Sequence, residues 1–189
     1  MPAGGSAAAA ATAMAAGLVE KAASLSIEHW IGAANIGKRA AVLRKVATLL
    51  IDADAAAYTE YIKALRRARG LHTEQRETVV ATPRERIVEV PLSIVRSAAE
   101  VAELAAELAE HGNPNLRSDA YVALQLAAAA ARGAAVTLAQ NVPTAKDSRL
   151  VEARRLSASV SARASRRPAP RRAGASGRAP ARSRGSGRR

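Results

Sequence analysis

The residues best suited to acid–base chemistry lie among small side chains, in the run Asp52-Ala-Asp54-Ala-Ala-Ala-Tyr58. Asp is a poor helix former, so two of them within an alanine-rich helical stretch need a reason. Asp54 and Tyr58 are four residues apart and therefore share one helix face. A carboxylate at this place could orient a water molecule or move a proton. A solvated helix face is the alternative, and the spacing alone leaves both interpretations open.

A short glycine motif, Gly4-Gly5-Ser6, directly precedes a predicted helix. Glycine lets the backbone approach a ligand closely, Ser6 can cap the helix, and the free amides of a first helical turn favour an anion. The alternative is a plain flexible leader that ends in a capping serine.

The run from Gly112 to Asp119 reads Gly-Asn-Pro-Asn-Leu-Arg-Ser-Asp. A helix stop, a turn and a new cap would explain Gly112, Pro114 and Ser118. An acidic residue in the first turn of the next helix is favoured by the helix dipole. The run still holds more polar side chains than a turn requires, because Asn113 and Asn115 have no part in that explanation.

Several other chemistries are excluded by residue type. The chain has no Cys, so it has neither disulfides nor thiolate metal ligands. Its three His residues, His29, His72 and His111, do not have the spacing of metal ligands, and we predict no metal site. The sequence contains neither a phosphate-binding loop nor a nucleophile elbow.

Helices must position these residues, since no segment alternates apolar and polar residues for long enough to suggest a strand. We predict an all-α fold, a bundle of about five helices, some of them long and kinked. A helical stretch that begins at Thr73 is disturbed at Pro83, and the helix that follows is kinked at Pro91. The predicted helices span residues 7–25, 38–69, 84–111, 118–140 and, for a short last helix, 147–157.

The net charge of +13 is concentrated at the C-terminal end. From Arg154 onward there are 12 Arg and no acidic residue, whereas residues 1–153 hold 17 basic and 16 acidic residues. We therefore predict a helical domain over 1–153 and a disordered arginine-rich tail over 154–189. Such a tail could bind nucleic acid nonspecifically, because it offers charge without stacking aromatics. The alternatives are a solvated extension and an out-of-frame reading of a GC-rich gene.

The rest of the composition bears on surroundings and partners. The longest apolar run, Ala7–Val19, is too short to span a membrane, so we expect no membrane segment and a cytoplasmic protein. Alanine side chains bury little area each, and we expect the thin core to need a partner subunit.

Taken in order, these motifs resemble the formiminotransferase-cyclodeaminase / methenyltetrahydrofolate cyclohydrolase family. The likeness runs from Pro2 to about Val151 and includes Val90-Pro91-Leu92 and Asn141. It implies an all-helical homodimeric enzyme that acts on a tetrahydrofolate one-carbon derivative. A cyclodeaminase closes formimino-tetrahydrofolate to the methenyl form with release of ammonia, whereas a cyclohydrolase adds water to the methenyl form.

The resemblance also implies roles for single residues. Asp54 would be the catalytic acid or base. Reduced folate would be bound by the other motif residues, in part across a dimer interface, namely Gly4, Gly5, Ser6, Asn113, Asn115, Ser118, Asp119 and Asn141.

The sequence departs from the family pattern in four places. The chain starts almost at the glycine motif, where members have a preceding helix. Ala3 replaces a third glycine, Thr137 stands where the family tends to have Asn, and the arginine tail replaces the end of the last helix. A non-enzymatic family member or a nucleic-acid-binding protein is therefore the alternative function.

Overall fold

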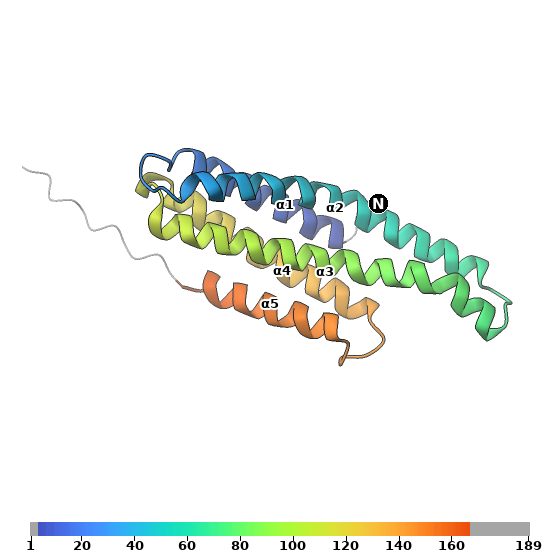
Figure 1. Ribbon diagram of the computed structural model, residues 1–189. Helices are drawn as coiled ribbons and strands as arrows, with labels where there is room; N and C mark the ends of the chain where they lie inside the picture. Colours follow the sequence, from blue (N-terminus) through green and yellow to red (C-terminus); the bar gives the residue numbers. More distant parts are fainter. Residues whose placement is uncertain (1–3, 167–189) are drawn as a thin grey trace, which may run out of the picture.

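The computed structural model describes residues 4–166, which form five α-helices and one short 3₁₀ turn (Figure 1). This part of the chain contains no strand, and the predicted all-α bundle is confirmed. The elements are α1 (Gly4–Ser24), α2 (Ala33–Arg67), α3 (Thr73–His111), η1 (Pro114–Leu116), α4 (Arg117–Asn141) and α5 (Ser148–Ala164).

The first four helices form the bundle, and α5 lies along the outside of α3 and α4 (Figure 1). Helix α1 is surrounded by α2, α3 and α4. The longer helices α2 and α3 continue well past the first residue of α1, as Figure 1 shows beside the label N. The first turn of α1 therefore lies partway along the bundle rather than at its end.

Alanine dominates the core because it lets neighbouring helices approach closely. Helix α4 illustrates this, since eight of its ten buried residues are Ala and the other two are Leu124 and Leu138. Larger side chains fill the space around them, and those most fully buried include Leu92, Ile94 and Leu150. Packing at such density makes the relative position of the helices precise.

Helix α3 runs without interruption through both of its prolines, so the predicted break at Pro83 is wrong. A proline inside a helix removes one backbone donor and crowds the preceding turn. The packing of α3 against α1, α2, α4 and α5 offsets that cost, because most of its inward face, including Pro91, is buried.

The last helix is longer than the sequence suggested. Helix α5 ends at Ala164, so the expected domain end at Ala153 falls inside it, and the first part of the supposed tail is helical. The reason is the helical spacing of Ser157, Val160 and Ala164, which are buried against the bundle although arginines surround them. The remainder of the predicted disordered tail, residues 167–189, lies outside the described residues.

One helical segment, Pro114–Asn141, is long and apolar enough to cross a membrane by length and composition. The sequence analysis did not single out this segment, because it took Ala7–Val19 as the longest apolar run. In the bundle this segment packs against α1, α3 and α5, and 44% of its most apolar stretch is buried there.

Candidate active site

Asp54 lies in the middle of α2, and its carboxylate contacts the first turn of α1. Its Oδ2 accepts a hydrogen bond of 2.7 Å from the backbone N–H of Ser6. The same oxygen lies 2.9 Å from the Ser6 hydroxyl, whose single proton can serve either Asp54 or the Ile51 carbonyl at 3.0 Å. Asp54 is only 7% exposed, so it does not belong to a solvated helix face. A carboxylate at a helix N-terminus is also favoured by the helix dipole.

Gly5 is required by this contact. A Cβ on residue 5 would lie 2.1 Å from Asp54 Oδ1 and 2.6 Å from its Cγ, which is far inside any van der Waals contact. The glycine motif is therefore more than a flexible leader. It lets the carboxylate of α2 lie directly against the backbone of α1.

A cavity of about 260 Å³ opens beside Asp54, in the space beyond the first turn of α1. Its wall combines apolar side chains with hydroxyl and amide groups. The lining residues are Asp54, Ala57, Tyr58, Ile87, Val136, Thr137, Gln140 and Asn141. The Asn141 side chain is held in place by a 2.6 Å hydrogen bond from its amide nitrogen to the Ile87 carbonyl. Gly4 also lies at this place, since a Cβ there would be 3.4 Å from Thr137 Oγ1.

The two carboxylate oxygens of Asp54 differ in their surroundings. Oδ2 is held by Ser6, whereas Oδ1 makes no hydrogen bond within residues 4–166. An oriented carboxylate with one uncommitted oxygen beside a cavity can accept a proton from a bound molecule and return it. Tyr58, which is four residues further along α2, lines the same cavity as the spacing suggested.

The second predicted group of residues lies at the other end of α1. Asp119, in the first turn of α4, forms a 2.8 Å ion pair with Lys21 near the end of α1. Ser6 and Lys21 are separated by about 22 Å along the axis of α1, at 1.5 Å per residue. In the single chain the structure therefore brings Gly4, Gly5, Ser6, Asp54 and Asn141 together, and it leaves Asn113, Asn115, Ser118 and Asp119 apart from them.

Much of this second group of residues forms the turn between α3 and α4. The backbone N–H of Asn113 donates to the Ser26 hydroxyl at 2.9 Å, and its side-chain amide donates to the Leu25 carbonyl at 3.1 Å. Its side-chain oxygen accepts from the N–H of Asn115 at 3.0 Å and so begins the 3₁₀ turn. Ser118 was expected to cap α4, but it lies inside the first turn, because the helix already begins at Arg117.

Some cavity residues were not singled out from the sequence. Gln140 precedes Asn141 at the polar end of an alanine-rich helix, and that change in composition could have indicated it. Ile87 and Val136 gave no signal, because an apolar residue that lines a cavity has the same helical spacing as one in the core. No group of three acidic or His side chains within residues 4–166 could hold a metal ion.

Comparison with known proteins fits this arrangement of helices. A solved structure of formiminotetrahydrofolate cyclodeaminase from Thermotoga maritima superimposes with a TM-score of 0.74 at 22% sequence identity. The similarity covers 86% of this chain and 85% of that one, and at such identity it shows the fold alone. No curated protein matches the sequence. The family model described as formiminotransferase-cyclodeaminase matches residues 1–159, and the chain therefore belongs to the formiminotransferase-cyclodeaminase family.

Proposed function

We propose that the protein is a cytoplasmic enzyme of folate one-carbon chemistry, a formimino-tetrahydrofolate cyclodeaminase or a methenyl-tetrahydrofolate cyclohydrolase. The observation that carries the proposal is the buried Asp54 carboxylate, fixed by Ser6 on one oxygen and uncommitted on the other, beside a cavity of mixed polarity. The family and its Thermotoga maritima member support the substrate class.

Asp54 can serve both reactions through proton transfer. In cyclodeamination the N10 nitrogen of the folate attacks the protonated formimino carbon on N5, which gives a tetrahedral carbon that bears an amino group. Asp54 Oδ1 takes the proton from N10 and delivers it to that amino group, which leaves as ammonia and yields the methenyl cation. In the cyclohydrolase reaction the same oxygen takes a proton from the water that attacks the methenyl carbon.

The test uses the absorbance of methenyl-tetrahydrofolate with the purified full-length protein. A rise in absorbance from formimino-tetrahydrofolate, with ammonia released in equal amount, would identify a cyclodeaminase. A loss of absorbance from the methenyl form faster than the buffer blank would identify a cyclohydrolase. If folded protein changed neither substrate, the enzymatic proposal would be wrong and the alternative of a non-enzymatic member would take its place.

The proposal includes a homodimer, because one face of the bundle is apolar and uncovered in the single chain. On α1, Ala7 and Met14 are exposed at a seven-residue spacing, and Met14 is 62% exposed. On α4, which packs beside α1, Val122, Ala129 and Val136 repeat at the same spacing, with the two valines 51% and 64% exposed. Apolar stripes of this spacing are typical of a helix–helix seam.

The two groups of site residues lie at opposite ends of this α1/α4 face. The Asp54 cavity adjoins Val136 at one end, and the Lys21–Asp119 ion pair lies at the other. In a two-fold dimer the same face is used twice in opposite orientations. One protomer would then supply the turn from Asn113 to Asp119 to the cavity of its partner, which would join the two halves of the site.

Met14→Glu tests the dimer, because it places a charge in the middle of the α1/α4 face. The variant should sediment as a monomer and lose turnover even though Met14 does not line the cavity. Val151→Glu is the matched control, since Val151 is similarly exposed but lies on α5. Dimers of undiminished activity in the Met14→Glu variant would show that this face is not the interface.

A further inference from the structure

Another cavity, of about 310 Å³, lies at the opposite end of α4 from the Asp54 cavity, where α3 ends, α4 begins and α5 ends (Figure 1). Its volume is near the lower end of the usual range for ligand pockets, about 300–1,000 Å³, so it would take a small molecule. The lining residues are Ala106, Ala109, Glu110, Arg117, Tyr121, Leu124, Arg163 and Arg166.

The wall of this cavity is positively charged. Three arginines and one glutamate line it, which gives a net charge of +2. Glu110 does little to neutralise the arginines, because its side chain is 77% exposed and lies 4.0 Å from His111. Arg163 lies 3.9 Å from Glu103, at the outer limit of an ion pair. Such a concentration of one sign of charge in a hollow attracts a ligand of the opposite sign.

Arg117 is the member of this group whose surroundings most require an anion. It is the first residue of α4, where the positive end of the helix dipole disfavours a cation. Its Nε is buried and makes no hydrogen bond within the described part of the chain, which costs free energy. The guanidinium carbon lies 5.9 Å from the centre of the Tyr121 ring, a contact that attracts the cation but gives Nε no acceptor.

Helix dipoles alone do not explain the three arginines. Arg163 lies in the last turn of α5 and Arg166 just beyond it, where a cation is favoured. The same effect opposes Arg117, because that residue lies at the start of a helix. A ligand that accepts from all three would account for their position around one cavity.

We propose that this cavity binds the dianionic phosphate group of a small molecule, with Arg117, Arg163 and Arg166 as donors. A phosphate monoester carries a charge of about −1.5 to −2 and three acceptor oxygens, which match the net charge of the wall and the three guanidinium groups. A single carboxylate has less charge and only two oxygens. A small turn of the Arg117 guanidinium would give Nε the acceptor that it lacks. The inference does not depend on the proposed function, since the cavity is separate from Asp54.

The experiment is calorimetric titration of the full-length protein in a phosphate-free buffer at constant ionic strength. Inorganic phosphate and glycerol 3-phosphate are the probes, and each should bind once per chain. Succinate divides the same charge between two separate carboxylates, and it should bind at least about tenfold more weakly. Tighter binding of glycerol 3-phosphate would identify a phosphate monoester as the ligand, and tighter binding of inorganic phosphate the free ion; both results support the phosphate site.

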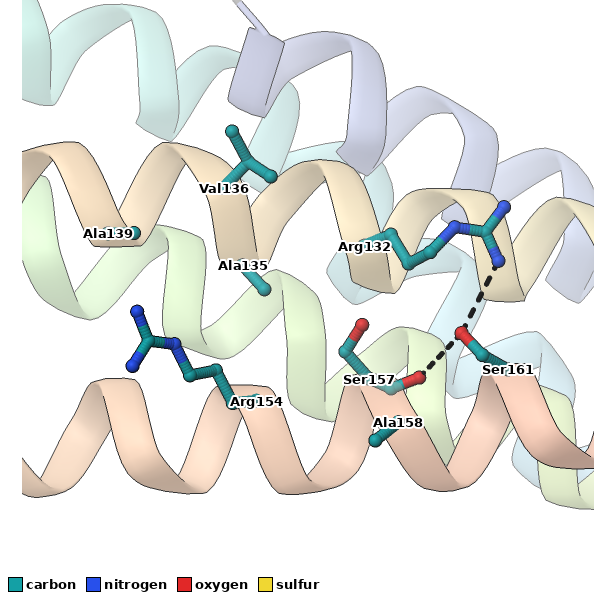
Figure 2. A pocket seen from close by; sticks show the side chains of 8 residues that line it. All are labelled: Arg132, Ala135, Val136, Ala139, Arg154, Ser157, Ala158 and Ser161. Carbon is teal, nitrogen blue, oxygen red and sulfur yellow. Dashed lines mark hydrogen bonds between the residues drawn. The ribbon is translucent and has the colours of Figure 1, made fainter. Parts of the chain in front are cut away.

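Substitutions on α4 assign the binding to this cavity. Arg117→Met keeps an apolar stem and removes the guanidinium, so the affinity for phosphate should fall at least about tenfold. Arg117→Lys keeps the charge without the planar fork and should restore only part of the affinity. Arg132→Ala is the matched control on the same helix, because Arg132 lines a separate groove between α4 and α5 and donates to the Ser161 hydroxyl there (Figure 2). This control should bind phosphate as the wild type does.

Thermal unfolding distinguishes a binding role of Arg117 from a structural one. Without phosphate, Arg117→Met should melt no lower than the wild type, because it removes an unsatisfied donor and a cation at a helix start. Saturating phosphate should raise the melting temperature of the wild type only. A variant that melts below the wild type equally with and without phosphate would make Arg117 a structural residue and overturn the inference.

Three binding results would also overturn it. These are no binding of either phosphate probe to the wild type, succinate binding as tight as that of phosphate, and unchanged phosphate affinity in Arg117→Met. The last result would place the phosphate on other arginines of the chain.

Discussion

Gly5→Ala should show whether the position of the Asp54 carboxylate matters for activity. The change adds one methyl group beside the carboxylate and leaves the carboxylate itself and all charges unaltered. That methyl would start 2.1 Å from Asp54 Oδ1, so the carboxylate must retreat by about 1.3 Å to reach an ordinary contact of 3.4 Å. Such a retreat breaks the 2.7 Å hydrogen bond from the Ser6 N–H.

The expected magnitude follows from these contacts. Loss of a hydrogen bond to a charged group costs about 1.5–3 kcal/mol, and replacing Gly by Ala inside a helix returns about 0.5–1 kcal/mol. The free energy of unfolding should therefore fall by about 1–2 kcal/mol. Misplacement of a catalytic group by about 1 Å costs on the order of 100-fold in rate, so turnover should fall much further than stability.

The assay combines denaturant unfolding with methenyl-tetrahydrofolate turnover at saturating substrate. Gly17→Ala is the control on the same helix, because its Cβ would meet only the flexible Arg44 side chain at 3.5 Å and should stabilise the protein. If Gly5→Ala kept wild-type turnover and stability, the carboxylate would not need its observed position, and its assignment as the acid–base group would be refuted.

Three further predictions concern charge. Asp54→Asn preserves the size of the side chain and should reduce turnover by at least about 100-fold while circular dichroism shows an intact helical fold; wild-type turnover would exclude a catalytic role. The side-chain hydrogen bond from Arg149 lowers the pKa of Asp147 to about 2, below its ordinary value of about 3.9. This carboxylate therefore stabilises the start of α5 fully above about pH 4, and the stabilisation is lost as the pH falls toward 2, which thermal unfolding of wild type and Asp147→Asn should show as curves that converge in acid. Deletion of residues 167–189 should abolish any salt-sensitive retention on DNA and leave folate turnover unchanged; retention that persisted would assign DNA binding to the bundle.

Local physics explains which parts of the fold could be predicted from sequence. Helix periodicity and glycine stops placed α1, α2 and α4 within a few residues, because these signals act over single turns. The break expected at Pro83 was wrong, since a local rule cannot include the packing of α3 against four other helices. The end of α5 was missed because its arginines suggested a tail, while Val160 and Ala164 carried the helical spacing that the composition obscured.

Local sequence signals were also insufficient to predict the contacts of the candidate site. The motif order indicated that Gly5, Ser6 and Asp54 belong together, but only the structure shows that the glycine makes room for the carboxylate. Gly112 marks the turn that the sequence predicted, yet nothing in its neighbourhood indicates that Asn113 reaches back to Ser26 and Leu25. Contacts between residues far apart in the chain depend on how helices pack, which a pattern of single residues does not encode.

The contact between Asp54 and Ser6 matters both for the packing of α1 against α2 and for the proposed chemistry. A buried carboxylate is costly unless it is hydrogen-bonded, and here the first turn of α1 supplies both the donors and a favourable dipole. The same donors occupy only Oδ2, so Oδ1 keeps its capacity to accept a proton, and the Asp54 side chain lines the cavity. A core built mostly from alanine can hold this geometry because its helices pack closely. The apolar α1/α4 face that this thin core leaves uncovered also lies between the two groups of predicted site residues. On this argument, loss of the dimer and loss of activity should occur together.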